Sequence, residues 1–145
     1  MVDTPGEPLR RLVTARARGL CEYCRSPEDF APARHSLEHI HPRAAAGPTN
    51  DENLALACQG CNSYKGSKTE ARDPETNALA PLFHPRRQHW QGHFSWSTDG
   101  LEIIGLTPTG RATIALLRLN RQGLQNLRYA LTAIQRHPKG RVRKE

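Results

Sequence analysis

Four cysteines in two matching pairs have the clearest chemical meaning in this sequence. Cys21 and Cys24 form one Cys-x-x-Cys pair, and Cys58 and Cys61 form the other. The two-residue spacing lets both thiolates of a pair turn toward one ion, and zinc prefers four thiolates in a closed tetrahedron. The pattern therefore predicts a structural zinc site. An iron–sulfur cluster is the main alternative; free thiols or a redox pair fit less well, because no βαβ pattern surrounds either motif.

Polar residues inside and beside this cysteine frame could cut a phosphodiester bond. Glu38 and His39 are adjacent, Asn53 follows, and Asn62 comes directly after the second pair. Hydrolysis needs an activated water and neutralisation of charge on the phosphate and the leaving oxygen. An imidazole, with a pKa near ~6.5, can accept the proton of that water at neutral pH. Carboxylate and amide oxygens suit Mg²⁺ or Mn²⁺, which keep several waters and bind phosphate.

The order and spacing of these residues resemble the HNH endonuclease family, in particular its bacterial members with a four-cysteine zinc site. The resemblance covers residues 21–65. It implies a ββα-metal core in which His39 is the general base and Asn53 braces the loop and orients the histidine ring. It also implies that Glu38 and Asn62 hold a catalytic Mg²⁺ or Mn²⁺, and that cleavage leaves 5′-phosphate and 3′-hydroxyl ends.

Two positions depart from the usual spelling of the motif. Asn62 stands where the family often has histidine, which favours Mg²⁺ or Mn²⁺ over Zn²⁺ or Ni²⁺ as the catalytic ion. Glu38 stands in place of Asp or His, a milder departure. Residues 81–86 and 105–110 also resemble segments of the same subgroup, but chemistry assigns them no catalytic role.

Basic residues are the expected contacts to a nucleic acid. The chain has 21 Lys and Arg against 14 Asp and Glu, a formal charge of +7. Each cation placed on a phosphate releases a condensed counterion, so this excess favours DNA as the partner. Lys65 resembles the lysine that often follows the second Cys-x-x-Cys pair in this family. The alternative to a phosphate contact is that its side chain is simply solvated. The residues expected to contact phosphate are Lys65, Arg43, His84, Arg86 and Arg87.

Local patterns predict the elements that would position these residues. Apolar residues at helical spacing predict a helix that begins near Pro8 and ends before Gly19. Short strands are expected at 36–41 and 54–57, a helix at 62–69, and an extended connector over the proline-containing residues 72–88. Thr98-Asp99-Gly100 predicts a hairpin turn, and two helices are expected to begin at Thr107 or Thr109 and at Asn120.

The fold expected from these elements is α+β. A zinc-stapled ββα-metal core would carry an N-terminal helix, a C-terminal β-hairpin and C-terminal helices. One domain is expected over 1–145, with the core at 19–70, the accessory hairpin and helices at 81–137, and a basic tail at 138–145. Only 37% of the residues are hydrophobic, so such a core would gain stability from a metal.

The start of the chain and its hydropathy favour a cytoplasmic protein without membrane contact. Residues 1–8 carry two acids and no apolar run, unlike a signal peptide. No stretch approaches the roughly 18 apolar residues of a membrane span. In a reducing compartment, paired cysteines bind metal more often than they form disulfides.

The leading hypothesis is a metal-dependent DNA endonuclease that hydrolyses phosphodiester bonds with His39 as general base. An alternative is a non-catalytic zinc-containing nucleic-acid-binding module whose HNH site has decayed, although binding alone would not need the full set of Glu38, His39, Asn53 and Asn62. A redox or metal-sensing protein ranks third and gives His39 no role. The motifs do not determine whether one or both strands of the nucleic acid are cut, which sequence is preferred, or whether the substrate is DNA or RNA. They also leave open the biological pathway and the oligomeric state.

Overall fold

A hairpin followed directly by a short helix carries the cysteine-bracketed segment. The computed structural model describes residues 6–138. Its helices are α1 (Glu7–Arg16), α2 (Gln59–Lys65), α3 (Trp90–His93), α4 (Pro108–Leu117) and α5 (Gln122–Ala133). Its strands are β1 (Ser36–His39), β2 (Leu54–Ala57), β3 (Glu70–Arg72), β4 (Leu79–Pro81), β5 (Phe94–Trp96) and β6 (Ile103–Gly105). Short 3-10 helices are η1 (Glu28–Phe30), η2 (Arg43–Ala45) and η3 (Asp51–Asn53).

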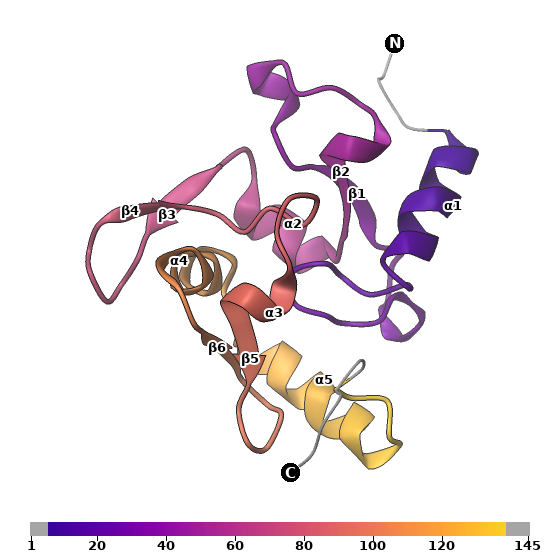
Figure 1. The fold of residues 1–145 in the computed structure, drawn as a ribbon. Helices are drawn as coiled ribbons and strands as arrows, with labels where there is room; N and C mark the ends of the chain where they lie inside the picture. Colours follow the sequence, from indigo (N-terminus) through magenta and orange to yellow (C-terminus); the bar gives the residue numbers. More distant parts are fainter. Residues whose placement is uncertain (1–5, 139–145) are drawn as a thin grey trace.

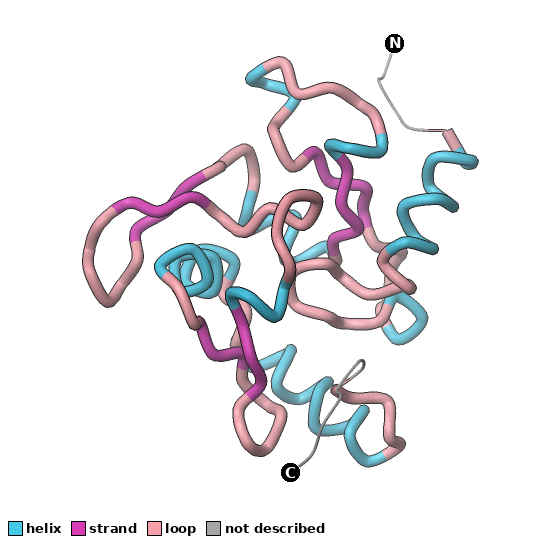
Figure 2. The backbone as a smooth tube through the Cα atoms, in the orientation of Figure 1, coloured by secondary structure: helices cyan, strands magenta, loops and turns pink. Residues whose placement is uncertain are grey.

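The strands form three separate antiparallel pairs, β1-β2, β3-β4 and β5-β6. Figure 2 shows these pairs well apart from one another, joined by helices and loops. In Figure 1 the β1-β2 hairpin and α1 lie at the upper right, α4 lies at the left and α5 lies at the bottom. The order β1, β2, α2 is the ββα arrangement expected from the sequence, so the predicted fold class is confirmed.

The two faces of the β1-β2 hairpin pack against different helices. His39 pairs with Leu54, and Glu38 pairs with Ala55. Paired residues share a face, and neighbouring residues of one strand face opposite sides. Leu54 packs against Val13 of α1, so His39 lies on the α1 face, while Glu38 lies on the face that contacts α2. The hairpin therefore separates two adjacent residues of the motif.

Helix α2 begins within the second cysteine pair, at Gln59 rather than at the predicted Asn62. The sulfur of Cys58 accepts a hydrogen bond from the backbone N–H of Cys61 at 3.4 Å and so caps the helix. Gly66, with a positive φ of 55°, ends the helix earlier than predicted. The second Cys-x-x-Cys pair thus also forms the first turn of α2.

The segment 72–88 contains part of a hairpin that the sequence did not predict. Strands β3 and β4 pair antiparallel, with Pro74 in the turn and Pro81 at the end of β4, so neither proline interrupts the ladder. The buried Asp73 closes the turn and accepts two hydrogen bonds from Arg111 of α4, both 2.9 Å long. The prediction failed because this partner lies far away in the sequence.

The C-terminal elements follow the prediction closely. Thr107 caps α4 by accepting a hydrogen bond from the N–H of Gly110 at 3.0 Å. Helix α5 begins at Gln122 rather than at Asn120, because the Asn120 side chain bonds the backbone of Ile103 in both directions, at 2.6 and 2.9 Å. This contact joins the α4-α5 link to β6.

One hydrophobic core connects the cysteine-bracketed segment to the C-terminal elements. It contains all four cysteines together with aromatic residues of the segment 83–94 and leucines near α4 and α5. The indole of Trp90 donates a hydrogen bond to the carbonyl oxygen of Tyr23 at 3.0 Å. Phe83 contacts Tyr23 edge-on at 6.5 Å between ring centroids. The segment after β4 therefore packs directly on Tyr23, within the first Cys-x-x-Cys pair.

Candidate functional site

The four cysteines converge as their spacing predicted. One ligand atom from each lies within 4.8 Å of all the others, and Sγ of Cys24 lies 3.6 Å from Sγ of Cys58. A tetrahedral zinc site with Zn–S bonds of about 2.3 Å has sulfurs about 3.8 Å apart. All four side chains are buried, and burial raises the pKa of the Cys21 thiol well above its usual value. The donor set and its spacing fit a structural metal such as zinc, whose charge would compensate the thiolates.

Arg121 lies against this cluster and was not predicted from the sequence. Its guanidinium group lies 3.5 Å from Sγ of Cys58 and 3.7 Å from Sγ of Cys61. Gly60 makes the approach possible, because a Cβ at that position would collide with the guanidinium. Arg121 follows Cys61 by 60 residues, so no local pattern links it to the cysteine pair.

Asn53 fixes the loop between β1 and β2. Its amide NH₂ donates to the carbonyl oxygens of His41 at 3.0 Å and Pro48 at 2.8 Å. Its Oδ1 accepts from the backbone N–H of His41 at 2.9 Å. The side chain is buried, and these three hydrogen bonds use most of its capacity.

His39 lies at the end of β1, on the α1 face of the hairpin. Its Nε2 lies 2.8 Å from Oγ1 of Thr49, a residue of the loop that Asn53 fixes. The hydroxyl can donate or accept, so this contact is compatible with either neutral tautomer of the ring. The half-buried ring is therefore held in one orientation by the loop.

Glu38 lies in the interior between the hairpin and α2. Its Oε1 accepts a hydrogen bond of 2.7 Å from the hydroxyl of Tyr23, and its Oε2 lies 2.6 Å from Nζ of Lys65. Burial raises the pKa of Glu38, and the Lys65 ammonium only partly offsets this. Lys65 also donates to the carbonyl oxygen of Ile40 at 3.1 Å. Lys65 is 1% exposed, so the structure places it neither in solvent nor on the outer surface.

One oxygen of Glu38 fits a hard cation. Oε2 is buried and, among residues 6–138, accepts no hydrogen bond of normal geometry, although the Lys65 ammonium is in close charge contact. Asn62 lies on α2 and is half-buried. A carboxylate and an amide are suitable ligands for Mg²⁺ or Mn²⁺. A metal on Oε2 would have to replace Lys65.

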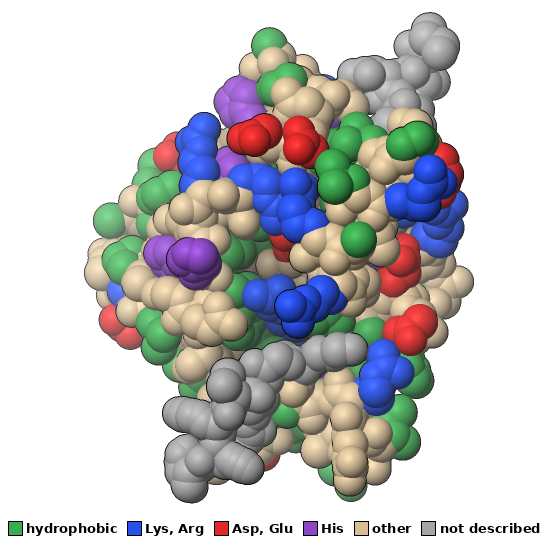
Figure 3. All heavy atoms as spheres, turned by 45° about the vertical axis from the view of Figure 1, so that its right-hand side comes forward, with side chains coloured by type: hydrophobic (Ala, Val, Ile, Leu, Met, Phe, Trp, Pro, Cys, Tyr) green, Lys and Arg blue, Asp and Glu red, His purple; other side chains and the backbone are tan. Residues whose placement is uncertain are grey.

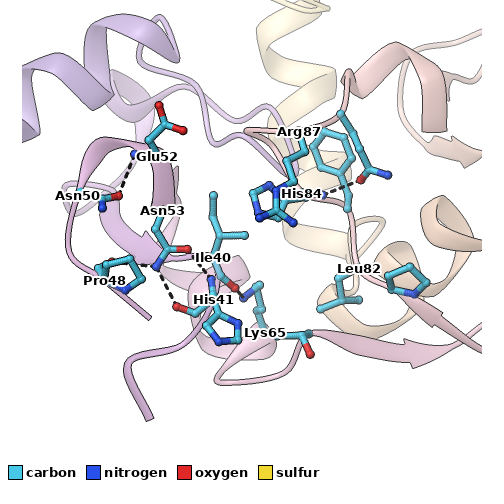
Figure 4. Close-up of a pocket in the computed structure, with 14 residues that line it drawn as sticks. Ile40, His41, Pro48, Asn50, Glu52, Asn53, Lys65, Leu82, His84 and Arg87 are labelled. Carbon is cyan, nitrogen blue, oxygen red and sulfur yellow. Dashed lines mark hydrogen bonds between the residues drawn. The ribbon is translucent and has the colours of Figure 1, made fainter. Parts of the chain in front are cut away.

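A cleft of about 720 Å³ opens between the β1-β2 loop and the segment after β4. In Figure 4, Asn53, Pro48 and His41 form one wall, His84, Arg87 and Leu82 form the other, and Lys65 lies between them. Glu38, His39 and Asn62 are not among its lining residues. The structure thus brings four of the expected site residues to one cleft, Asn53, Lys65, His84 and Arg87, and His41 lines it as well.

The second wall of this cleft uses its basic residues in different ways. Arg87 is exposed and lines the cleft. Arg86 instead turns inward, where it forms an ion pair with Glu22 and donates to the carbonyl oxygen of Leu54 at 3.1 Å. The N–H of Arg86 donates to Nδ1 of His84 at 3.2 Å, so a neutral His84 ring carries its proton on Nε2. Arg86 therefore supports the wall, while Arg87 and His84 face the cleft.

On the face of the molecule drawn in Figure 3, basic side chains are not gathered in one place. Figure 3 shows separate groups of Lys and Arg side chains on two sides of a central hollow, with acidic side chains among them. Arg43 is exposed at the start of η2 in the β1-β2 loop. None of the helices within residues 6–138 is both long and apolar enough to cross a bilayer.

The cysteine-bracketed segment matches a known protein family. The model of the HNH endonuclease family matches residues 21–68, which include both cysteine pairs, β1, β2 and α2. These residues are similar to the HNH endonuclease family over about a third of the chain. The resemblance inferred from the sequence is confirmed, and the match indicates a nuclease-type function. Comparison with curated proteins found no match, and comparison with solved structures found none either.

Proposed function

We propose that this protein is a metal-dependent DNA endonuclease that hydrolyses phosphodiester bonds. The observation that carries the proposal is the cleft, which joins Asn53 and Lys65 of the segment that matches the HNH family to His84 and Arg87 from outside it. Such a wall of cationic and N–H groups suits a phosphate backbone. Arg87 and the Nε2 proton of His84 would bind backbone oxygens, with exposed Arg43 as a further contact. The HNH family match supports nucleic acid as the partner.

The predicted site residues of the segment that matches the HNH family would each have a role in catalysis or in holding the fold. His39 accepts the proton of the attacking water, and Thr49 and the loop fixed by Asn53 hold its ring. Glu38 and Asn62 would hold Mg²⁺ or Mn²⁺, which when bound neutralises phosphate charge and stabilises the leaving oxygen. The four cysteines would hold zinc, which keeps β1, β2 and α2 together.

One observation favours the second candidate, a non-catalytic nucleic-acid-binding module. Glu38 and His39 face opposite sides of the hairpin, and Glu38 is already paired with Lys65. A binding module would need the cleft and its basic residues but no base. It would bind DNA and leave it intact.

Cleavage of supercoiled plasmid separates the two candidates. Nicking is expected with Mg²⁺ or Mn²⁺, not with EDTA, and it should be lost in His39→Ala. His89→Ala is the matched control, because His89 is exposed and lies outside the cleft. His41→Ala tests the other histidine near the site. Loss of cleavage in His41→Ala but not in His39→Ala would assign the base to His41, and DNA binding without metal-dependent cleavage would favour the binding module.

A further inference from the structure

We propose that the ammonium group of Lys65 occupies the cation position on Glu38 in the metal-free protein. A phosphate in the cleft and a divalent cation on Glu38 would then bind cooperatively, because both require Lys65 to move. This inference rests on the proposed function, in which Glu38 holds the catalytic cation.

The contacts of Lys65 are those of a substitute cation. Its Nζ lies 2.6 Å from Oε2 of Glu38, yet within the described part of the chain Oε2 accepts no hydrogen bond of normal geometry. The Lys65 ammonium thus supplies the positive charge on this side of the carboxylate. Both side chains are almost fully buried, with 2% of Lys65 and 3% of Glu38 exposed. A buried carboxylate must keep a cation nearby or become protonated.

The position of Lys65 also gives it a route to the cleft. It is the last residue of α2, followed by Gly66 at a positive φ, and it has a flexible four-carbon stem. Lys65 lines the cleft, whereas Glu38 does not. Lys65 therefore contacts the Glu38 carboxylate and also borders the cleft, where Figure 4 shows it between the two walls. A short movement of Nζ would exchange Glu38 for a phosphate oxygen.

Cooperativity follows from the cost of leaving either charge without a partner. If a metal displaces Lys65 when no phosphate is present, the ammonium loses its anion in a largely buried place. If a phosphate attracts Lys65 when no metal is present, Glu38 is left uncompensated. When both bind, each charge regains a partner. Each ligand must then raise the affinity for the other by the same factor.

Direct measurement of Mn²⁺ binding tests this coupling without relying on cleavage. The zinc-loaded full chain would carry His39→Ala to keep a short DNA duplex intact, and electron paramagnetic resonance would report free Mn²⁺. In this parent protein the duplex should raise Mn²⁺ affinity roughly tenfold. Lys65→Met should bind Mn²⁺ roughly tenfold more tightly without DNA, and the effect of the duplex should nearly vanish. The matched control is Lys68→Met, at an exposed lysine of the same segment, which should behave like the parent.

Two outcomes would overturn the inference. Lys65→Met could bind Mn²⁺ no more tightly than the parent, or it could keep the full effect of the duplex. If Lys65→Met does not fold, nuclear magnetic resonance of the Lys65 ammonium in the parent gives the answer. Its signal should shift when Mg²⁺ and duplex are added together, and an unchanged signal would count against the exchange. Intact coupling without plasmid cleavage would refute only the proposed hydrolysis, whereas plasmid cleavage with uncoupled Mn²⁺ binding would refute only the exchange.

Discussion

At the scale of single residues, the contacts of a side chain decide which roles it can take. Arg86 and Arg87 are neighbours with the same side chain, but Glu22 and the carbonyl of Leu54 hold only Arg86. The sequence offers no sign of this difference. Glu38 is similar, because its partners Tyr23 and Lys65 lie 15 residues before it and 27 residues after it. Residue types could be predicted to form a site, but their buried partners could not.

Asn53→Ala should loosen the β1-β2 loop. The substitution removes two donated bonds and one accepted bond and leaves the backbone of His41 without these partners. Buried hydrogen-bonding groups left without partners cost about 1–3 kcal/mol, so a loss of about 2 kcal/mol in the free energy of unfolding is expected. Urea unfolding measures it. Asn50→Ala, at an exposed residue of the same loop, should cost clearly less, and equal losses would contradict the special position of Asn53.

His84 should make stability depend on pH. Burial, and to a smaller extent the nearby Arg87, lower the pKa of His84 below its ordinary 6.5. Between the folded and unfolded pKa values the unfolded chain binds more protons, so stability is full above about pH 6.5 and falls as pH decreases through the folded pKa. The melting temperature should therefore fall less between about pH 7 and pH 5 in His84→Gln than in the parent. His89→Gln serves as control. If the melting temperature of His84→Gln fell as much as that of the parent, the titration of His84 would not explain the pH dependence.

At the scale of elements, the two Cys-x-x-Cys pairs show where local patterns suffice. Strand β2 has the predicted bounds 54–57, because its run of apolar residues is short and ends at a cysteine. The start of α2 was predicted at Asn62, three residues too late, because the sulfur of Cys58 caps the helix from within the cysteine pair. The convergence of the four cysteines could be predicted from spacing. The contact of Arg121 with them could not, because it depends on the packing of α4 against α2, which lie far apart in the sequence.

Arg121→Gln should weaken metal retention. The guanidinium places positive charge and N–H donors beside Cys58 and Cys61, where a four-thiolate zinc site would carry net negative charge. Zinc release to a chromogenic chelator should be roughly tenfold faster in Arg121→Gln. Arg118→Gln is the matched control, because Arg118 also stacks on the Tyr64 ring but donates no bond to sulfur. Gly60→Ala should resemble Arg121→Gln, since its Cβ would displace the guanidinium. Unchanged release rates in both would assign Arg121 a packing role only.

At the scale of the whole molecule, the four-cysteine cluster belongs to both parts of the chain. The four cysteines share one core with Trp90, Phe94 and the leucines near α4 and α5. The Trp90 indole donates a hydrogen bond to Tyr23 within the first cysteine pair, and Arg121 contacts Cys61 of the second pair. The wall of the cleft formed by residues 81–88 rests on this same core through Phe83. The metal site, the cleft and the C-terminal helices should therefore be stable or unstable together.

Removal of the metal tests this dependence. Without a cation, four buried thiol groups lose the ion that holds the two cysteine pairs together, and the shared core should loosen on both sides. Chelation should therefore raise amide hydrogen exchange in α5 as well as in β1 and β2, and added zinc but not magnesium should restore protection. If α5 stayed protected while β1 and β2 exchanged freely, the C-terminal elements would be stable on their own. DNA binding through Arg87 would then be expected to survive loss of zinc, because the wall that carries it would remain folded.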